Sequence, residues 1–273
     1  MRQIPLPGCG LKLSRFVFGC ASLFNAGGAR RRRNLLAAAA DCGFSHFDTA
    51  PSYGFGMAER DLAPLLKARP DLTVTGKVGL FAPGGEDAPA AAILLRKVLG
   101  RLAPALSKAQ VDFSLARARG ALEGSLRRLG RERLDLYLLH APRLDLLAAD
   151  EWLNWLEALA ASGRIGAFGL AATGADGAAA FLDRAPALAR ILQCPDSLDR
   201  READALIARG RPPQLTYGYL AAARRSGAAP DGRFDVADIL ARALRRNRDG
   251  ALVVSTRKPE RLRDFTRAAA AEQ

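Results

Sequence analysis

Four polar residues lie at the ends of short apolar runs or just after them. Together, side chains of these types could transfer a proton. Asp48 and Tyr53 lie in GFSHFDTAPSYG, Lys77 in TVTGKVG and His140 in LDLYLLH. A phenol titrates at about 10 and is a poor acid or base at neutral pH. A nearby ammonium lowers the phenol pKa, and a carboxylate beside that ammonium keeps it charged. Because a neutral imidazole can orient a carbonyl oxygen, the set predicts protonation of a forming alkoxide, or the reverse.

Taken singly, each of these residues has an ordinary structural alternative. Asp48 could cap a helix, Tyr53 could pack in a loop, and Lys77 could lie on the surface. His140 could be a core histidine with satisfied hydrogen bonds. The second histidine of the chain, His46, lies inside a predicted strand, and we expect it to be structural.

The elements that must position these residues alternate along the chain. Apolar runs predict strands at residues 16–18, 46–48, 73–75, 134–139, 167–171, 191–193, 214–217 and 252–255. Helical patterns follow at residues 31–42, 57–68, 114–129, 151–162, 177–184, 201–208, 236–246 and 259–270. Eight strands, each followed by a helix, predict an α/β fold of the (β/α)₈ TIM barrel type, a single domain over residues 1–273. A doubly wound open sheet competes, but no GxGxxG follows the first strand.

In such a barrel the carboxyl ends of the strands share one rim, where active sites lie. Asp48, Tyr53, Lys77 and His140 leave three consecutive predicted strands at that rim. Two stretches interrupt the alternation. Residues 81–110, with one helix expected at 90–99, are predicted to form a lid or substrate loop. Residues 221–233 are predicted to form an irregular loop.

Composition narrows the function classes. Hydrophobic residues make up 49% of the 273 residues, and no apolar run reaches the length of a membrane span. The net charge of +13 and the run Arg30–Arg33 raise the alternative of nucleic-acid binding. Aromatic residues are only 7%, and no nucleic-acid-binding signature is present, so a basic surface that attracts small anions is favoured. Without a CxxC pair or an export signal, we expect reduced thiols and a cytoplasmic location.

The segments FDTAPSYG, TGK and GALEGSLRRLGRERLDLYLLHAP resemble the aldo-keto reductase family over nearly the whole chain. By this resemblance, Asp48, Tyr53, Lys77 and His140 correspond to the catalytic residues of the family. The resemblance also implies the (β/α)₈ barrel, a cofactor extended across its rim, and no metal. Residues 81–110, followed by VDFSLARARGALEGSLRRLG, are most similar to the sugar-dehydrogenase branch, which includes aldose and galactose dehydrogenases.

A phosphate site is expected in VVSTRKPERLRDF, where a strand turns into a helix whose N-terminus favours anions. An ordinary basic helix cap is the alternative; the resemblance places the adenosine phosphate here. The cations favour NADP(H) over NAD(H), although NAD(H) stays open, because the 2′-phosphate brings extra negative charge. The contacts expected from this segment are Ser255, Thr256, Arg257, Lys258, Arg261 and Asp264.

The resemblance also assigns residues that bind the nicotinamide end of the cofactor. Gln193 is similar to the glutamine that holds the carboxamide, and Tyr217 to the aromatic that stacks on the nicotinamide, with Tyr219 as its rival. Gly19 and Cys20 match backbone positions near the cofactor, and Asp48 lies beside it.

Three departures from the family pattern bear on function. Ala171 and Ala172 stand where Ser-Asn usually binds the carboxamide, so two hydrogen bonds are missing unless Thr173 substitutes. Asp264-Phe265 replaces the common Glu-Asn, which puts the adenine contacts in doubt. The sequence given ends at Gln273, so we expect a substrate pocket that is open or walled by residues 81–110.

The sequence therefore predicts an NADP(H)-dependent oxidoreductase that interconverts a small carbonyl compound and its alcohol, as a monomer or small homo-oligomer. No nucleic-acid or membrane partner is expected. Two alternatives stay open: a cofactor-binding sensor or scaffold with little catalysis, and a redox-neutral lyase or epimerase that uses the same site.

Overall fold

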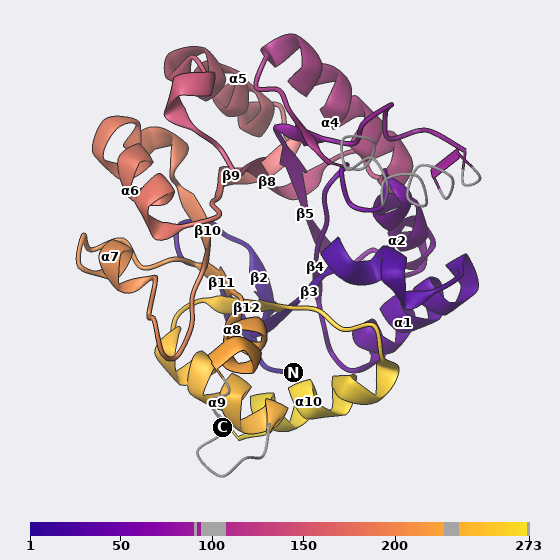
Figure 1. The fold of residues 1–273 in the computed structure, drawn as a ribbon. Helices are drawn as coiled ribbons and strands as arrows, with labels where there is room; N and C mark the ends of the chain where they lie inside the picture. Colours follow the sequence, from indigo (N-terminus) through magenta and orange to yellow (C-terminus); the bar gives the residue numbers. More distant parts are fainter. Residues whose placement is uncertain (90–91, 94–107, 227–234, 272–273) are drawn as a thin grey trace.

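Eight parallel strands close into a barrel, and helices surround it (Figure 1). The computed structural model describes residues 1–89, 92–93, 108–226 and 235–271. The hydrogen-bonded order around the barrel is β3, β4, β5, β8, β9, β10, β11 and β12, and β12 closes on β3. The strands are β3 (Phe16–Gly19), β4 (His46–Asp48), β5 (Thr73–Val78), β8 (Leu134–His140), β9 (Ile165–Ala171), β10 (Ile191–Pro195), β11 (Leu215–Tyr217) and β12 (Ala251–Val254). The predicted (β/α)₈ barrel and its eight strands are confirmed.

Each predicted helical range overlaps an α-helix, although α7 covers only half of its range, and α8 was not predicted. The α-helices are α1 (Ala29–Asp41), α2 (Met57–Ala68), α4 (Leu115–Leu129), α5 (Ala149–Ala161), α6 (Ala175–Arg184), α7 (Asp204–Ile207), α8 (Tyr219–Ser226), α9 (Val236–Arg246) and α10 (Leu262–Ala270). Short 3₁₀ turns are η1 (Cys20–Ala26), η3 (Leu144–Leu146), η4 (Pro186–Leu188) and η5 (Pro259–Arg261). The Ser114 side chain caps the start of α4, and Gly130, with φ 64°, ends it in the left-handed region.

One prediction about a loop is wrong. Residues 221–233 were expected to be irregular, but α8 runs through Ser226. Leu220 and the three alanines after it are strong helix formers, and Gly218, at φ 106°, lets the chain turn sharply into the helix. Residues 227–234, the rest of that expected loop, lie outside the described residues.

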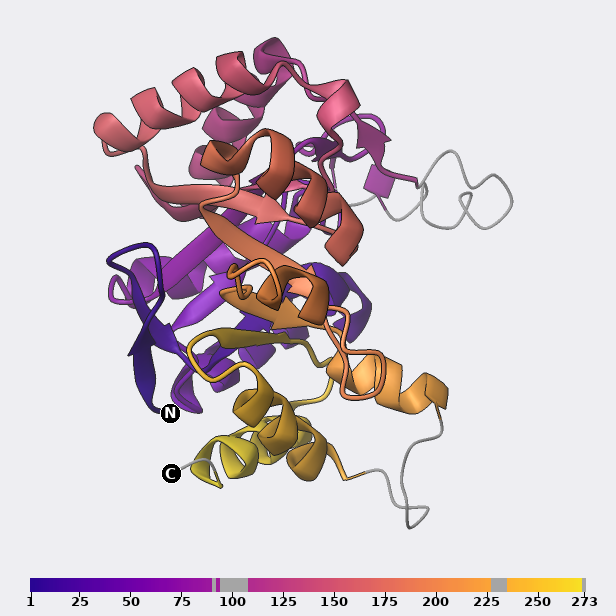
Figure 2. The same ribbon diagram turned by 90° about the vertical axis from the view of Figure 1, so that its left-hand side faces the viewer.

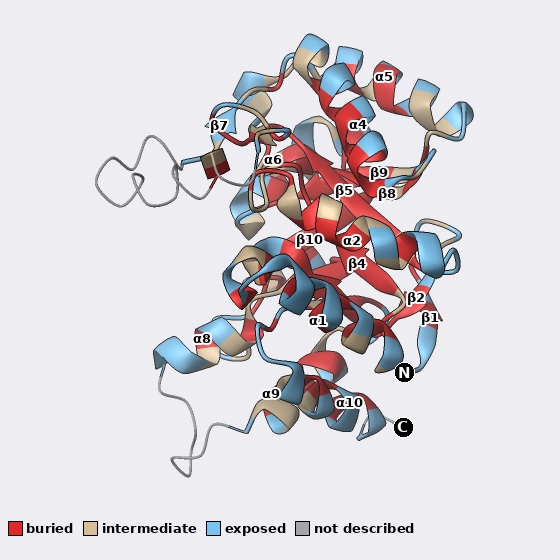
Figure 3. Ribbon diagram, turned by 90° about the vertical axis from the view of Figure 1, so that its right-hand side faces the viewer, coloured by how far each residue is buried: buried red, intermediate tan, exposed pale blue. Residues whose placement is uncertain are grey.

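An N-terminal hairpin closes one end of the barrel. Its strands β1 (Gln3–Pro5) and β2 (Lys12–Ser14) pair antiparallel, and Ile4, Leu6 and Leu13 pack into the barrel interior. Figure 2 shows this hairpin at one end of the barrel and α8 toward the other. The carboxyl ends of the strands therefore face the end that carries α8. Figure 3 shows that the strands and the inward faces of the helices are buried.

The segment after β5 is closed at its base by two short antiparallel strands. Strand β6 (Leu80–Phe81) pairs with β7 (Gln110–Val111). Buried Glu86 fixes the described part of this segment, since it accepts two hydrogen bonds of 3.0 Å from Arg117 on α4. The expected helix at residues 90–99 lies outside the described residues except for 92–93. Among the described residues no helix is long and apolar enough to span a membrane.

Candidate active site

The barrel brings the four predicted polar residues to one rim. Asp48 ends β4, and Tyr53 lies in the turn between β4 and α2. Lys77, near the end of β5, pairs in register with Leu138 of β8, and His140 ends β8. Because these parallel strands are neighbours, their carboxyl ends converge and their side chains meet.

A hydrogen-bond chain connects three of the four. The Lys77 ammonium donates to Asp48 Oδ1 in a short, buried ion pair. It also donates to the Tyr53 hydroxyl at 3.3 Å and to the Thr49 carbonyl at 3.4 Å. The Gln193 amide donates to the second Asp48 oxygen at 2.9 Å. Both carboxylate oxygens are therefore occupied, and the ammonium is held beside the phenol oxygen.

The His140 ring packs against the Tyr53 ring. The two rings meet edge to face, with centroids 5.7 Å apart and an interplanar angle of 86°. Burial, and secondarily the positive charge of Lys77, lower the pKa of His140 to about 3. The imidazole is therefore neutral at physiological pH, and it can take part in hydrogen bonding to an oxygen without carrying charge.

Burial corrects one electrostatic expectation. Sequence reasoning has Lys77 lowering the phenol pKa, but burial raises the pKa of Tyr53 more than Lys77 lowers it. Burial also acts to lower the pKa of Lys77, yet Asp48 and Tyr53 outweigh it, and that pKa is raised. The Tyr53 phenol is therefore neutral and lies beside the Lys77 ammonium. Tyr53 can donate its proton, and Lys77 can stabilise the phenolate that remains.

A cavity of about 330 Å³ opens above these groups. Tyr53, Lys77, His140 and Asp48 line it. Of the predicted cofactor residues, Gly19, Asp48, Gln193, Tyr217 and Ser255 line it as well. Ala171 and Ala172 form part of its wall, with Thr173 beside them, so the wall where the family usually has Ser-Asn presents methyl groups.

The two rival tyrosines take different places. The Tyr217 hydroxyl donates to the Ala172 carbonyl at 2.9 Å, which fixes the ring at the cavity edge. Tyr219 is 3% exposed, and its hydroxyl donates to Asp196 at 2.6 Å. Tyr219 borders a second cavity instead. Of the two, Tyr217 is thus the one that lines the same cavity as Tyr53, Lys77 and His140.

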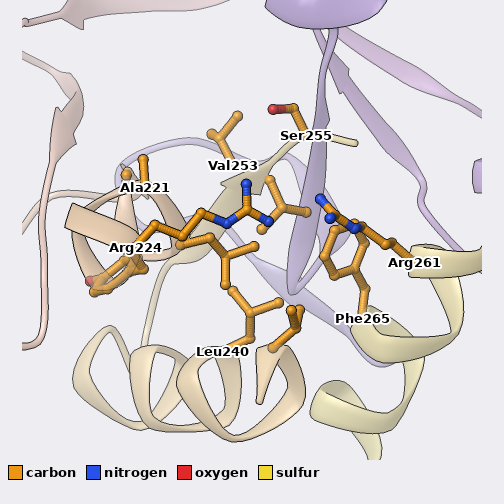
Figure 4. A pocket seen from close by; sticks show the side chains of 12 residues that line it. Ala221, Arg224, Leu240, Val253, Ser255, Arg261 and Phe265 are labelled. Atoms are coloured by element: carbon orange, nitrogen blue, oxygen red, sulfur yellow. The ribbon is translucent and has the colours of Figure 1, made fainter. Parts of the chain in front are cut away.

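The second cavity, of about 180 Å³, lies next to the first, and Figure 4 shows the side chains that line it. The two share the lining residues Gly218, Ala221, Val253, Val254 and Ser255. Arg261, predicted to bind phosphate, lines the second cavity. So does Arg224 of α8, which the sequence reasoning missed because its segment was taken for a loop.

Five other predicted cofactor residues line neither cavity. Cys20 is buried, although its neighbours Gly19 and Ala21 border the first cavity. The Thr256 hydroxyl donates to the Lys258 carbonyl and accepts from the Lys258 N–H, both at 3.0 Å, and so shapes the turn. The side chains of Arg257 and Lys258 are exposed, and Asp264 pairs with Arg267 at 2.6 Å. Of the six contacts expected from the phosphate segment, only Ser255 and Arg261 line a cavity.

The aldo/keto reductase family profile matches residues 15–191, which is more than half of the chain. The chain belongs to the aldo/keto reductase family. The matched region carries all four rim residues. The solved structure of an aldo-keto reductase from Pseudomonas aeruginosa has a TM-score of 0.73 and 26% identity, and covers 99% of this chain and 96% of that one.

Two curated relatives are sugar enzymes by name. D-threo-aldose 1-dehydrogenase from a Pseudomonas species is 32% identical over 170 residues, 59% of this chain and 50% of that protein. 6-dehydroglucose reductase from Agrobacterium fabrum is 30% identical over 167 residues, with the same shares. The chain spans about half the length of these curated relatives. A glycerol dehydrogenase structure from Gluconobacter oxydans, 23% identical with a TM-score of 0.73 over 97% of this chain and 89% of its own, shares the fold.

Members of this family generally use NAD(P)H, and the residues present fit such a group. The Gln193 Oε1 atom is buried without a hydrogen-bond partner among the described residues, so it can accept a carboxamide N–H. A Cβ at Gly19 would meet the Val253 side chain at 3.0 Å, so glycine keeps this wall open. The two joined cavities offer an elongated site with polar groups at both ends.

Proposed function

We propose that this aldo/keto reductase is an NADP(H)-dependent oxidoreductase that interconverts a carbonyl compound and its alcohol, with Tyr53 as general acid and base. The observation that carries the proposal is the 3.3 Å contact between the Tyr53 hydroxyl and a Lys77 ammonium already paired with Asp48. This arrangement borders a cavity large enough for a small substrate.

Each residue has a distinct role in reduction. Tyr53 donates its proton to the carbonyl oxygen, and Lys77 stabilises the phenolate that remains. Asp48 keeps the ammonium charged, and neutral His140 orients the carbonyl oxygen. Bound NADPH supplies the hydride from carbon 4 of its nicotinamide. In oxidation the same groups act in reverse, and Tyr53 accepts the alcohol proton.

The residues that would hold the cofactor lie along the two cavities. Gln193 would bind the carboxamide of the cofactor, and Tyr217 would lie against its nicotinamide ring. Ser255 lines the passage between the cavities, and Arg261 binds the phosphate at the far end. The names of the two curated relatives favour a sugar or its oxidised form as the substrate.

One observation favours a second candidate, a cofactor-binding sensor with little catalysis. Ala171 and Ala172 give the cavity wall methyl groups where hydrogen-bonding side chains are usual, which weakens the hold on the nicotinamide end. Turnover separates the candidates. A panel of aldoses, aldehydes and ketones is incubated with NADPH, and the matching alcohols with NADP⁺, while absorbance is followed.

The sharpest test of the proton donor is Tyr53→Phe. We expect kcat to fall by about 10²- to 10⁴-fold while the affinity for NADP⁺ stays within about two-fold. Tyr137→Phe is the matched control, because the buried Tyr137 hydroxyl has no hydrogen-bond partner among the described residues and lines neither cavity. Full activity in Tyr53→Phe would overturn the role of Tyr53. Product formed without net change in the cofactor would indicate the lyase or epimerase alternative.

A further inference from the structure

Four consecutive arginines lie at the start of α1, and the fold divides them into two pairs. Arg32 is buried and forms an ion pair with Asp61 of α2, and Arg33 lies 3.4 Å from the same carboxylate. Arg30 and Arg31 are exposed, and neither forms a hydrogen bond or ion pair with another residue that the structure describes. Two of the four charges are therefore compensated within the protein, and two face solvent.

The two unpaired arginines are unfavourable where they lie. The N-terminus of a helix carries a partial positive charge, so acidic side chains stabilise it and basic side chains destabilise it. The first turn of α1 contains no acidic residue. Arg30 and Arg31 therefore weaken the start of the helix without a contact that offsets the effect. A local arrangement that lowers stability in this way indicates a role in function.

Both arginines lie at the rim that carries the candidate active site. Because α1 follows β3, it begins at the carboxyl end of the barrel strands. Figure 1 shows α1 next to the segment that leads from β12 into α10. A surface hollow of about 600 Å³ is lined by residues of both elements, namely Gly28, Arg30, Arg31, Asn34, Ala38 and Pro259. Arg261, two residues after Pro259, lines the second cavity, so one short turn separates the hollow from that cavity.

More positive charge lies on the other side of the hollow. Arg257 and Lys258 are exposed in the turn before η5, and Arg263 is exposed near the start of α10. Residues 257–263 hold four basic residues and one acidic residue, Glu260. The potentials of neighbouring like charges add, so this edge of the rim is a positive surface on a protein whose net charge is +13.

A surface of this kind attracts anions before they bind. A nicotinamide dinucleotide carries a pyrophosphate, and NADP(H) carries in addition a phosphate monoester with a charge of about −1.5 to −2 at pH 7. Exposed charges at the edge of a site change mainly the association rate and its dependence on salt. Nucleic acid fits this surface less well, because such a contact neutralises many phosphates, whereas the start of α1 presents only two unpaired cations.

We propose that Arg30 and Arg31 form an electrostatic approach surface that speeds the association of the anionic dinucleotide with the adjacent cavities. This inference rests on the proposed function. It concerns the rate at which the dinucleotide arrives, and it assigns neither arginine a contact with the bound cofactor.

Stopped-flow measurement of NADPH fluorescence gives the association and dissociation rate constants separately. In wild type, the association rate constant should fall about ten-fold between about 20 mM and about 500 mM NaCl. The double variant Arg30→Gln with Arg31→Gln should associate about three- to five-fold more slowly than wild type at low salt, and equally fast at high salt. Its dissociation rate constant should stay within about two-fold of wild type. NADH carries less charge, so its association should slow less.

The double variant Arg184→Gln with Arg245→Gln is the matched control. It removes the same net charge from exposed positions in the last turns of α6 and α9, at the end of the barrel away from the rim. The control should associate with NADPH nearly as fast as wild type. Urea denaturation gives a second readout. Loss of Arg30 and Arg31 should leave the unfolding midpoint unchanged or raise it, because the helix start loses repulsive charge.

Four results would overturn the inference. Equal slowing in both double variants would show that net charge alone sets the rate. Faster dissociation with unchanged association would indicate a direct contact with the bound dinucleotide. A lower unfolding midpoint without Arg30 and Arg31 would assign them a structural role. Binding of a DNA oligonucleotide that is lost in the same variant would make nucleic acid the partner. Wild-type protein that does not bind NADPH would instead refute the proposed function.

Discussion

Gln193 holds Asp48 from across the barrel, with its amide nitrogen 2.9 Å from Asp48 Oδ2. Both residues are buried, at 4% and 3% exposure. Lys77 occupies the other carboxylate oxygen, so β4, β5 and β10 meet at one carboxylate. The Gln193 carbonyl oxygen is left without a partner among the described residues. One side chain therefore both fixes the Asp48–Lys77 pair and presents an acceptor to the cavity.

Replacing Gln193 by Met removes this donor while keeping a side chain of similar length. We expect the free energy of unfolding to fall by about 1–3 kcal/mol, because a buried charged acceptor loses a hydrogen bond. Urea denaturation measures the change. Gln3→Met, at an exposed position of β1, serves as the control and should have little effect. Equal stability of wild type and Gln193→Met would show that the hydrogen bond contributes nothing.

The convergence of Asp48, Tyr53, Lys77 and His140 could be foreseen from the sequence. Each follows an apolar run, and parallel barrel strands place their carboxyl ends on one rim. The apolar runs were enough for this prediction, because the positions of the strands decide which residues come together at the rim. The roles given to these residues stay proposals until they are tested.

The phosphate end could not be foreseen in the same way. Which of the clustered cations Arg257, Lys258 and Arg261 faces inward depends on the turn that Thr256 shapes with its own hydrogen bonds. The position of Arg224 in the lining of the second cavity could not be predicted either, because it depends on how α8 packs over that cavity. The net rise in the pKa of Tyr53 was missed as well, since burial is a property of the packed barrel.

The turn that carries Tyr53 is tied to the segment after β5 through Arg60. Its guanidinium donates to the Glu86 carbonyl at 2.7 Å and to the Phe55 carbonyl at 3.0 Å. Phe55 has φ 59°, an uncommon conformation for a non-glycine residue, so the contact stabilises a strained turn next to Tyr53. Arg60→Gln should lower the free energy of unfolding by about 1–2 kcal/mol and reduce kcat several-fold.

Urea denaturation and steady-state kinetics measure these two effects. Arg69→Gln is the control, because the exposed Arg69 side chain pairs with Asp71, and an exposed pair of this kind contributes about 0–1 kcal/mol. A loss of stability in Arg60→Gln with kcat unchanged would show that the turn holds Tyr53 without help from Arg60.

His46 makes the stability of the fold sensitive to acid. Its two ring nitrogens lie 2.7 Å from the hydroxyls of Thr73 and Thr75, and burial lowers its pKa to about 3. The unfolded chain, in which a histidine titrates at about 6.5, binds more protons than the folded chain between these pH values. Stability therefore falls as pH decreases below about 6.5, by about 2 kcal/mol at pH 5 from this residue.

The pH dependence of urea unfolding between pH 7 and pH 5 tests this contribution. In His46→Gln the decline with falling pH should be smaller than in wild type by that amount, whatever the absolute stability of the variant. Carboxylates titrate equally in both proteins, so their share cancels. Identical slopes would mean that His46 takes up its proton in the folded state.

Ala171 and Ala172 line the cavity with methyl groups, and this affects how tightly the nicotinamide end of the cofactor would bind. Both residues are 5% exposed and line the 330 Å³ cavity, so larger polar side chains have space on that side. Ala171→Ser with Ala172→Asn restores the pair that is common in the family. Each new hydrogen bond to the carboxamide should raise the affinity for NADP⁺ and NAD⁺ alike by about five- to ten-fold, because both carry that group.

Calorimetry with NADP⁺ and NAD⁺ measures this gain without turnover. Thr173→Val tests whether the neighbouring hydroxyl already substitutes for the missing pair. If it does, Thr173→Val weakens both dinucleotides and the Ser-Asn variant gains little. If Thr173→Val is neutral and the Ser-Asn variant binds no better, the nicotinamide carboxamide does not lie against this wall, and Gln193 alone would hold it.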